Sequence, residues 1–191
     1  MRLDYKPKFD KIVELLLYLS AKRPGADHYQ AVKFLYLADR AHINQYGRPI
    51  TFESYAALPF GPVASNALNM IKGKRQTLAR AGISKLPIQL KKLDNVIILN
   101  APEREVNYDV FSKSDLKIFD AILKKFGSKT FNELYEITHS HDAYKSAWGR
   151  RGDKKSAPIR YEDMIKAGPI RKAGFEKEDV IRELESVASH L

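Results

Sequence analysis

Residues 31–71, AVKFLYLADRAHINQYGRPITFESYAALPFGPVASNALNMI, are the stretch around which the rest of the chain is organised. From Ala31 to Ile43, apolar residues occur on nearly every side of a predicted helix. A helix that is apolar all round is usually buried in the middle of a domain. We expect a turn at residues 46–50, a short extended piece, and then a second helix opened by residues 60–63. Pro62 suits the first position of that helix, because the N–H that proline lacks would be unpaired there.

Asp39 and His42 are polar residues on the otherwise apolar side of the first helix. They are three positions apart, which places them on one helix face. A buried charge needs a partner, so we expect Asp39 to be buried and paired with Arg48 or His42. Asp39 and His42 could also form an acid–base pair, which would need a pocket and a tuned pKa; a structural ion pair is the commoner arrangement.

Composition indicates one globular domain spanning residues 1–191, with 44% hydrophobic and 29% charged residues. The chain has no cysteine, which excludes disulfides, thiol catalysis and cysteine-ligated zinc and fits a cytoplasmic protein. The longest apolar run, residues 15–19, is far too short to span a bilayer, and we find no signal peptide. We therefore expect a cytoplasmic protein without membrane contact.

The net charge of +10 is gathered into two windows of the sequence. Residues 72–92 hold seven basic residues and no acidic one, and residues 145–172 hold nine basic and three acidic residues. Such windows attract phosphate groups or an acidic protein surface. The plainer interpretation is a solvated surface on a basic protein.

Periodicity predicts a mainly α, compact helical domain with one small β-hairpin or short sheet. A first amphipathic helix begins near Phe9 and ends by Pro24-Gly25, and alternation between residues 86 and 99 predicts the hairpin. Capping boxes at Ser112 and Thr130 predict two later helices. Residues 149–191 are expected to form an irregular basic segment, with a short helix near Tyr161, and then a C-terminal helix over residues 180–191.

Two other kinds of function have partial support in the sequence. Helix, turn, helix and basic hairpin in that order suggest a winged-helix DNA-binding repressor, but Val63 to Asn66 offer a poor set of base-reading side chains. Residues 139–142, HSHD, lack the spacing of a metal site, and a polar loop explains them more simply. No phosphate loop, dinucleotide fingerprint, nucleophile elbow or metalloprotease motif is present, so we expect no enzyme, metal or cofactor.

The ordered set Phe34 to Arg40, His42, Tyr46 to Ile50 and Gly61-Pro62-Val63 resembles the Panacea domain, the SocA-like antitoxin domain of bacterial and phage toxin–antitoxin pairs. The resemblance extends more weakly to Leu134, Thr138-His139 and Trp148. The family-like positions are Tyr36, Asp39, His42, Tyr46, Gly47, Arg48, Pro49, Tyr55, Gly61, Pro62, His139 and Trp148. The resemblance implies that the chain binds and neutralises a cognate toxin protein, and that it could deliver this toxin to a AAA+ protease as an adaptor.

We expect the toxin to be held on a mixed surface with apolar anchors and a basic rim. Trp148 and Tyr144 lie beside Arg150 and Arg151, and aromatic residues with arginine are typical of interface hot spots. Asp39, His42 and Arg48 are the polar family-like positions and are further candidates for partner binding. The alternative for Trp148 is a place in the core.

Overall fold

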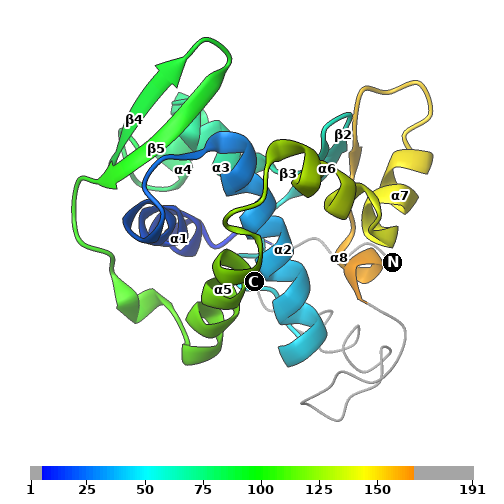
Figure 1. Ribbon diagram of the computed structural model, residues 1–191, viewed down its shortest axis with the longest axis horizontal. Helices are drawn as coiled ribbons and strands as arrows, with labels where there is room; N and C mark the ends of the chain where they lie inside the picture. Colours follow the sequence, from blue (N-terminus) through cyan, green and yellow to red (C-terminus); the bar gives the residue numbers. More distant parts are fainter. Residues whose placement is uncertain (1–5, 166–191) are drawn as a thin grey trace.

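The computed structural model describes residues 6–165, and one helix, α2 (His28–Tyr46), runs through the middle of them (Figure 1). The side chains from Ala31 to Asp39 are all buried, which confirms the central buried helix. Asp27 and Gln30 form a capping box at its start, and Gly47 ends it in the left-handed conformation with φ of 77°. The other elements therefore pack around a single apolar axis.

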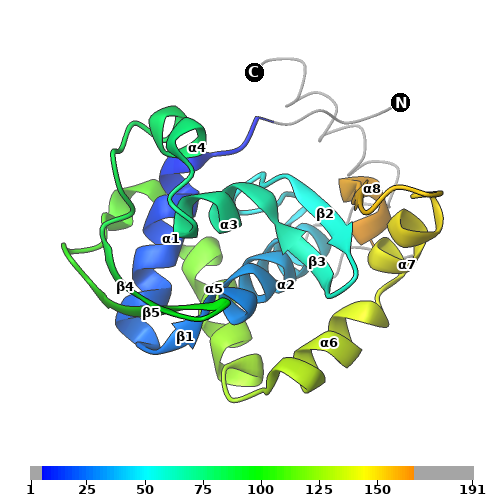
Figure 2. The same ribbon diagram turned by 90° about the horizontal axis from the view of Figure 1, so that it is seen from above.

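The helices that surround α2 come from the whole length of the described chain. They are α1 (Phe9–Lys22), α3 (Ser65–Ile71), α4 (Arg75–Arg80), α5 (Lys113–Phe126), α6 (Phe131–His139), α7 (Asp142–Gly149) and α8 (Tyr161–Met164), with a 3-10 turn, η1 (Tyr108–Val110), before α5. Helices α3, α5 and α6 contact α2 directly, and Figure 2 shows α2 between α5 and the β2–β3 hairpin. The capping boxes predicted at Ser112 and Thr130 are both present.

Two small antiparallel sheets accompany the helices, so the mainly α fold class is confirmed and a second sheet joins the predicted hairpin. The first has the order β1 (Ala26–Asp27), β5 (Val96–Pro102), β4 (Ile88–Leu93). The second has the order β3 (Gly61–Ala64), β2 (Tyr55–Leu58), β6 (Ala157–Pro158). Strand β6 and helix α8 lie in the basic segment after residue 149, and the helix predicted over residues 180–191 lies outside the described residues.

The largest departure from the sequence prediction is at residues 61–64. They form strand β3 instead of the start of a helix, and α3 begins only at Ser65. Leu58 pairs with Gly61 across the hairpin, so Pro59 and Phe60 form a two-residue turn, and Gly61 has φ of 93°. Pro62 lies in an outer strand, where its missing N–H breaks no ladder hydrogen bond. The expectation that Pro62 opens a helix is therefore wrong.

Gly61 provides the first prediction. A Cβ atom at this position would lie 2.5 Å from Nζ of Lys33 and 3.0 Å from Cε1 of His139. Gly25 has nearly the same φ, 92°, but a Cβ there meets nothing within 4 Å. Gly61→Ala should therefore lower the free energy of unfolding by roughly 1–3 kcal/mol more than Gly25→Ala does, because only the first overpacks its surroundings. Equal losses in denaturant melts would contradict this packing.

Candidate functional site

The carboxylate of Asp39 organises the loop that leads from α2 to β2. Its Oδ1 accepts hydrogen bonds from the backbone N–H groups of Ile50 (2.8 Å) and Thr51 (3.0 Å). Its Oδ2 accepts from the hydroxyls of Thr51 (2.5 Å) and Tyr55 (2.9 Å). The side chain has no exposed surface, and burial raises the pKa of Asp39 against the opposing effect of these hydrogen bonds. The predicted burial of Asp39 is confirmed.

The expected partner of Asp39 is wrong, since its four donors all come from residues 50–55. Arg48 and His42 instead face Asp115 at the start of α5. Nη2 of Arg48 lies 2.8 Å from Oδ1 of Asp115, and Nε2 of His42 lies 3.2 Å from the same atom. Asp115 also completes the capping box of α5, whose N-cap is Ser112, and accepts from Lys11. From the sequence alone, Asp115 was identified only as part of this capping box, so its role as the common acceptor was missed.

Burial raises the pKa of Asp115, but hydrogen bonds from His42, Lys11 and the Ser112 N–H, with the charge of Arg48, outweigh it and hold this pKa well below its usual range. A fully buried carboxylate is thus kept ionised by the cations around it. The cluster joins α1, α2 and α5 by charge-assisted bonds.

A serine also lies in this cluster, and its geometry decides what the cluster can do. Oγ of Ser114 and Oδ1 of Asp115 both lie at Nε2 of His42, at 3.0 and 3.2 Å, while Nδ1 faces the carbonyl of Arg48 at 2.7 Å. In a serine nucleophile triad, the carboxylate and the serine lie at opposite ring nitrogens. The arrangement therefore matches a structural network and not a nucleophile triad.

Glu53 is a second buried carboxylate in the same segment, and the sequence reasoning missed it. It accepts from the N–H groups of Ser54 (2.6 Å), Asn66 (3.1 Å) and Ala67 (2.9 Å), and from Nδ2 of Asn66 (2.6 Å). Asn66 and Ala67 form the first turn of α3, so Glu53 supplies the cap that Ala64 lacks. Burial raises the pKa of Glu53 to about 7. Together with Asp39 it positions β2 and α3.

Three side chains bind the carbonyls of the β2–β3 hairpin. Nζ of Lys33 donates to the carbonyls of Phe60 (2.5 Å) and Pro62 (2.9 Å), and the hydroxyl of Tyr144 donates to Leu58 (2.9 Å). Nε2 of His139 lies 3.1 Å from the carbonyl of Pro59. These donors come from α2, α7 and α6. The turn is therefore fixed by three elements that are distant in sequence, which no short motif reveals.

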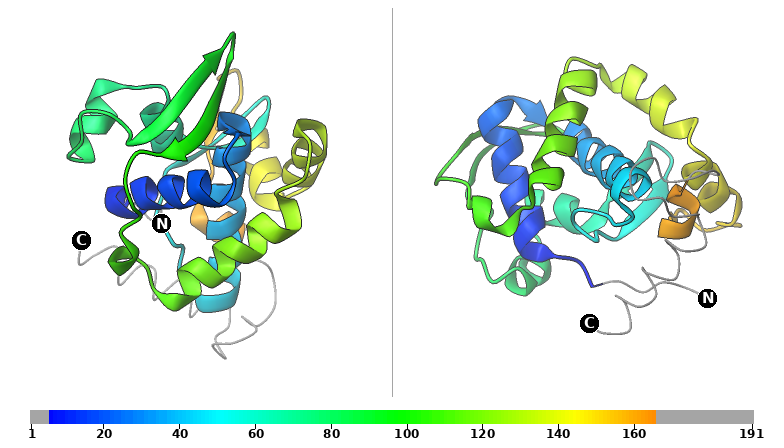
Figure 3. Two further views of the ribbon diagram at one scale, coloured as in Figure 1. Left: turned by 60° about the vertical axis from the view of Figure 1, so that its left-hand side comes forward. Right: turned by 90° about the horizontal axis from the view of Figure 1, so that it is seen from below.

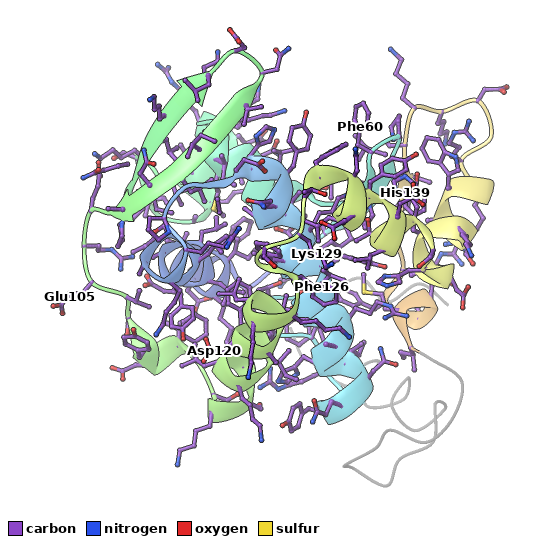
Figure 4. All side chains as sticks on the ribbon, viewed as in Figure 1. Phe60, Glu105, Asp120, Phe126, Lys129 and His139 are labelled. Carbon is purple, nitrogen blue, oxygen red and sulfur yellow. The ribbon has the colours of Figure 1, made fainter. Side chains whose placement is uncertain are left out.

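The turn carries the start of an exposed row of aromatic side chains. Phe60 is 56% exposed and its ring lies 6.1 Å from that of Phe131, which is 38% exposed. Phe131 is followed by Tyr135 at 6.3 Å, and Tyr135 stacks on His139 at 3.6 Å. Figure 4 shows Phe60 and His139 on the same side of the molecule.

The row continues along α7 to the residues predicted from sequence. His139 contacts Tyr144 at 4.3 Å, Tyr144 stacks on Trp148 at 5.9 Å, and the guanidinium of Arg151 lies 4.0 Å from the Trp148 ring centre. Trp148 and Arg151 are half-buried, whereas Tyr144 is buried. We define the aromatic strip as Phe60, Phe131, Tyr135, His139, Trp148 and Arg151. Phe60 was not predicted to belong to this surface, because residues 60–63 were expected to begin a helix.

The remaining predicted residues have local roles. Arg150 forms an ion pair with Asp163 at 2.5 Å, and Tyr46 packs on the His42 ring at 4.8 Å. Tyr36 is buried, packs on Tyr55 and has Nδ1 of His141 3.3 Å from its hydroxyl. Pro49 is buried, and its carbonyl accepts from Arg48. Asp39 and His42 have no exposed surface, so within this structure they shape the site and do not line it.

The polar residues 139–142 do not converge. Nε2 of His139 faces the hairpin and Nδ1 of His141 faces the Tyr36 hydroxyl, while Asp142 is exposed. Within residues 6–165, no three His, Asp or Glu side chains are placed to hold a metal ion together. Across the same residues, no helix combines the length and the apolar character needed to cross a membrane. An open groove lined by Ala21, residues 102–106 and Tyr108 lies apart from the aromatic strip.

Asp39 provides a prediction about stability. Asp39→Ala leaves two buried N–H groups and two hydroxyls without their acceptor, and each unsatisfied group costs about 1–3 kcal/mol. We expect the free energy of unfolding to fall by more than about 3 kcal/mol, with a smaller loss for Asp39→Asn, which keeps an acceptor oxygen. The exposed Asp153 provides the control, since Asp153→Ala should change stability by less than about 0.5 kcal/mol. A loss at Asp39 no larger than at Asp153 would refute its organising role.

Lys33 provides a prediction about pH. Burial lowers the pKa of Lys33 to about 7, whereas in the unfolded chain it titrates near 10.4. Between these values the unfolded state binds one more proton, so stability should rise with pH, by up to about 1.4 kcal/mol per pH unit between about pH 8 and 9.5. Lys33→Met should lack this rise in denaturant melts across that range. Parallel pH profiles for the two proteins would show that Lys33 is not the group responsible.

The family model for the SocA-like antitoxin, Panacea domain, matches residues 32–145, which include most of α2, both strands of the β2–β3 hairpin, α6 and the start of α7. No curated protein and no solved structure matches the chain. Since the family model spans more than half of the sequence, the chain belongs to the SocA-like antitoxin family and carries a Panacea domain.

Proposed function

We propose that this protein is the antitoxin of a toxin–antitoxin pair and neutralises its cognate toxin by binding it directly through the aromatic strip. Membership of the SocA-like antitoxin family supports the general role. The single structural observation that carries the proposal is the continuous row of ring contacts from the exposed Phe60 to Trp148. Its position on the surface makes it accessible to a protein partner.

The composition of the strip supports a protein partner. Aromatic residues and arginine are enriched at interface hot spots, and aromatic side chains bury large areas with few rotatable bonds to order. The strip contains Phe131, Tyr135 and Trp148 and ends on Arg151, which stacks on the tryptophan. It is also pre-organised, since carbonyls of the Phe60 turn accept hydrogen bonds from Lys33 and His139. A rigid surface loses less entropy on binding than a mobile one.

The charge around the strip indicates the sign of the partner surface. Lys145, Lys154 and Lys155 are exposed near its Trp148 end and form no ion pair with another described residue. Arg150 differs, because Asp163 already neutralises it. We therefore expect the toxin to present an apolar patch with an acidic border, with the exposed lysines speeding association.

The family resemblance also implies a proteolytic adaptor, which would deliver the bound toxin to a AAA+ protease. Both routes begin with the same binding step, so the strip serves either one. They differ in the fate of the toxin: direct neutralisation leaves it intact in the complex, whereas an adaptor lowers its abundance. Toxin levels measured during rescue separate the two routes.

The experiment is a co-expression rescue with the reading frame that lies beside the gene for this chain. We expect that frame to be toxic alone and harmless with the wild-type chain. Phe60→Ser should weaken toxin binding by at least about 2 kcal/mol, the hot-spot threshold, which is about 30-fold in Kd. Trp148→Ala should weaken it comparably, provided that circular dichroism shows both variants to be folded.

Tyr108→Ser is the matched control. Tyr108 is 54% exposed, almost as much as Phe60, but lies in η1 and outside the aromatic strip. The Tyr108→Ser protein should rescue cells and bind the toxin as the wild-type protein does. A folded Phe60→Ser protein that also binds with wild-type affinity would exclude the strip as the interface. A neighbouring frame that is harmless, together with no toxic partner in pull-downs, would exclude the antitoxin role.

A further inference from the structure

The first basic window, residues 72–92, contains exposed cations that the toxin-binding proposal does not use. Lys72 and Lys74 lie in the turn between α3 and α4, Arg75 begins α4, and Lys91 and Lys92 lie on β4; all five are exposed. None forms an ion pair with another residue in the range 6–165. We call these five residues the basic lobe.

The two other basic residues of the same window are already engaged. Lys85 lies 2.6 Å from Glu103, and the guanidinium of Arg80 lies 4.8 Å from the Phe9 ring centre. The window contains no acidic residue. The five cations of the lobe therefore remain available to a negatively charged partner.

The elements that carry the lobe follow the order of a winged helix-turn-helix. Helices α3 and α4 are joined by the three-residue turn 72–74, in which Gly73 has φ of 69°, and the hairpin of β4 and β5 follows. A short, glycine-containing turn between two helices is typical of this motif. From the sequence, the second helix of this motif was expected to start at Pro62, so α4, which carries the exposed Arg75 and Gln76, was not predicted as a helix.

The β4–β5 hairpin projects from the helical body (Figure 3). Residues 89–95 are exposed throughout, and β4 is the outer strand of its sheet. Its distal part is thus a two-stranded ribbon in which β4 is exposed, whereas Val96, Ile97 and Ile98 of β5 are half-buried. The major groove of B-form DNA, about 12 Å wide, accepts an α-helix or a two-stranded ribbon of this kind.

We propose that the basic lobe binds double-stranded DNA, chiefly through the phosphate backbone. The cations supply the attraction, and the projecting ribbon supplies a shape that fits the groove. Double-stranded RNA fits less well, because its major groove is too deep and narrow for side chains to enter. An acidic protein would find few apolar anchors on the lobe, whose exposed large apolar side chains are Leu90 and Leu93.

The number of cations gives a quantitative expectation. If all five contact phosphates, the logarithm of the binding constant falls with the logarithm of salt concentration with a slope of about −4.5. Affinity should then drop roughly 500-fold between about 50 and 200 mM salt. Because phosphate contacts carry no base information, affinity should vary little among duplexes of different sequence.

The experiment measures fluorescence polarisation of a labelled duplex DNA of about two helical turns, titrated with the full chain. Duplex RNA of the same sequence and a polyglutamate peptide serve as competitors. We expect DNA binding with a Kd on the order of 1–100 µM near 100 mM salt. Unlabelled duplex DNA should displace the labelled duplex more strongly than RNA or polyglutamate does. Stronger competition by RNA or by the peptide would assign the lobe to that partner and overturn the proposal.

Two variants test the lobe at separate places. Lys91→Ser/Lys92→Ser changes only the ribbon, and Lys72→Ser/Lys74→Ser changes only the turn, so a folding defect in one leaves the other informative. Each should reduce the salt slope by about 1.8. Both variants should still bind the toxin, since α7 and the β4–β5 hairpin lie on different sides of the molecule (Figure 1).

Lys117→Ser/Lys124→Ser is the matched control, because both lysines are exposed on α5 and the change removes the same charge. It should leave the salt slope within about 0.5 of the wild-type value. Loss of DNA binding in the control equal to that in the lobe variants would show a general charge effect and contradict the proposal. An unchanged salt slope in both lobe variants, or no DNA binding by the wild-type chain at about 50 mM salt, would also contradict the proposal.

Discussion

The structure of the central segment depends on one buried carboxylate that has no counter-charge. Asp39 lies in an apolar helix and accepts hydrogen bonds from two backbone N–H groups and two hydroxyls of residues 50–55. A buried carboxylate without such donors is costly, so the loop must close over it in this one conformation. The same loop brings Glu53 to the start of α3 and Tyr55 to the start of β2. The direction of β2, and with it the position of the Phe60 turn, follows from Asp39.

Hydrogen bonds to the carbonyls of the β2–β3 hairpin are the second constraint on the site. Lys33, buried in the same helix, binds two carbonyls of the β2–β3 hairpin, while His139 and Tyr144 bind two more. Hydrogen bonds from two buried polar side chains on α2, Lys33 and Asp39, thus hold the two ends of the segment from residue 50 to residue 62. The exposed aromatic strip rests on this polar scaffold, which explains how a small protein presents apolar rings at the surface without losing its fold.

Sequence reasoning predicted the features that depend on local pattern. The buried α2, the glycine stop at Gly47, the β4–β5 hairpin and the capping boxes at Ser112 and Thr130 all follow from periodicity or from short-range hydrogen bonding. The family was also recognised from the ordered motifs around α2. These features require no knowledge of which distant segments meet.

The errors arose where tertiary contacts decide. Arg48 pairs with Asp115, which is 67 residues away in sequence, instead of the nearby Asp39. Gly61-Pro62 lies in a strand because Lys33 and a partner strand hold it there, which overrides the helix-start signal of proline. One signal was available and was not used: Lys33 is a charge within the apolar run of α2, as Asp39 is.

The most direct measurement of the central claim is hydrogen exchange of backbone amides, followed by mass spectrometry, on the chain alone and in complex with its toxin. In the free chain, we expect slow exchange at Ile50, Thr51 and Ala67, whose N–H groups bond to buried carboxylates. In the complex we expect new protection over residues 58–62 and over α6 and α7, and none over β4. Protection confined to β4 or to the groove beside Tyr108 would contradict the central claim.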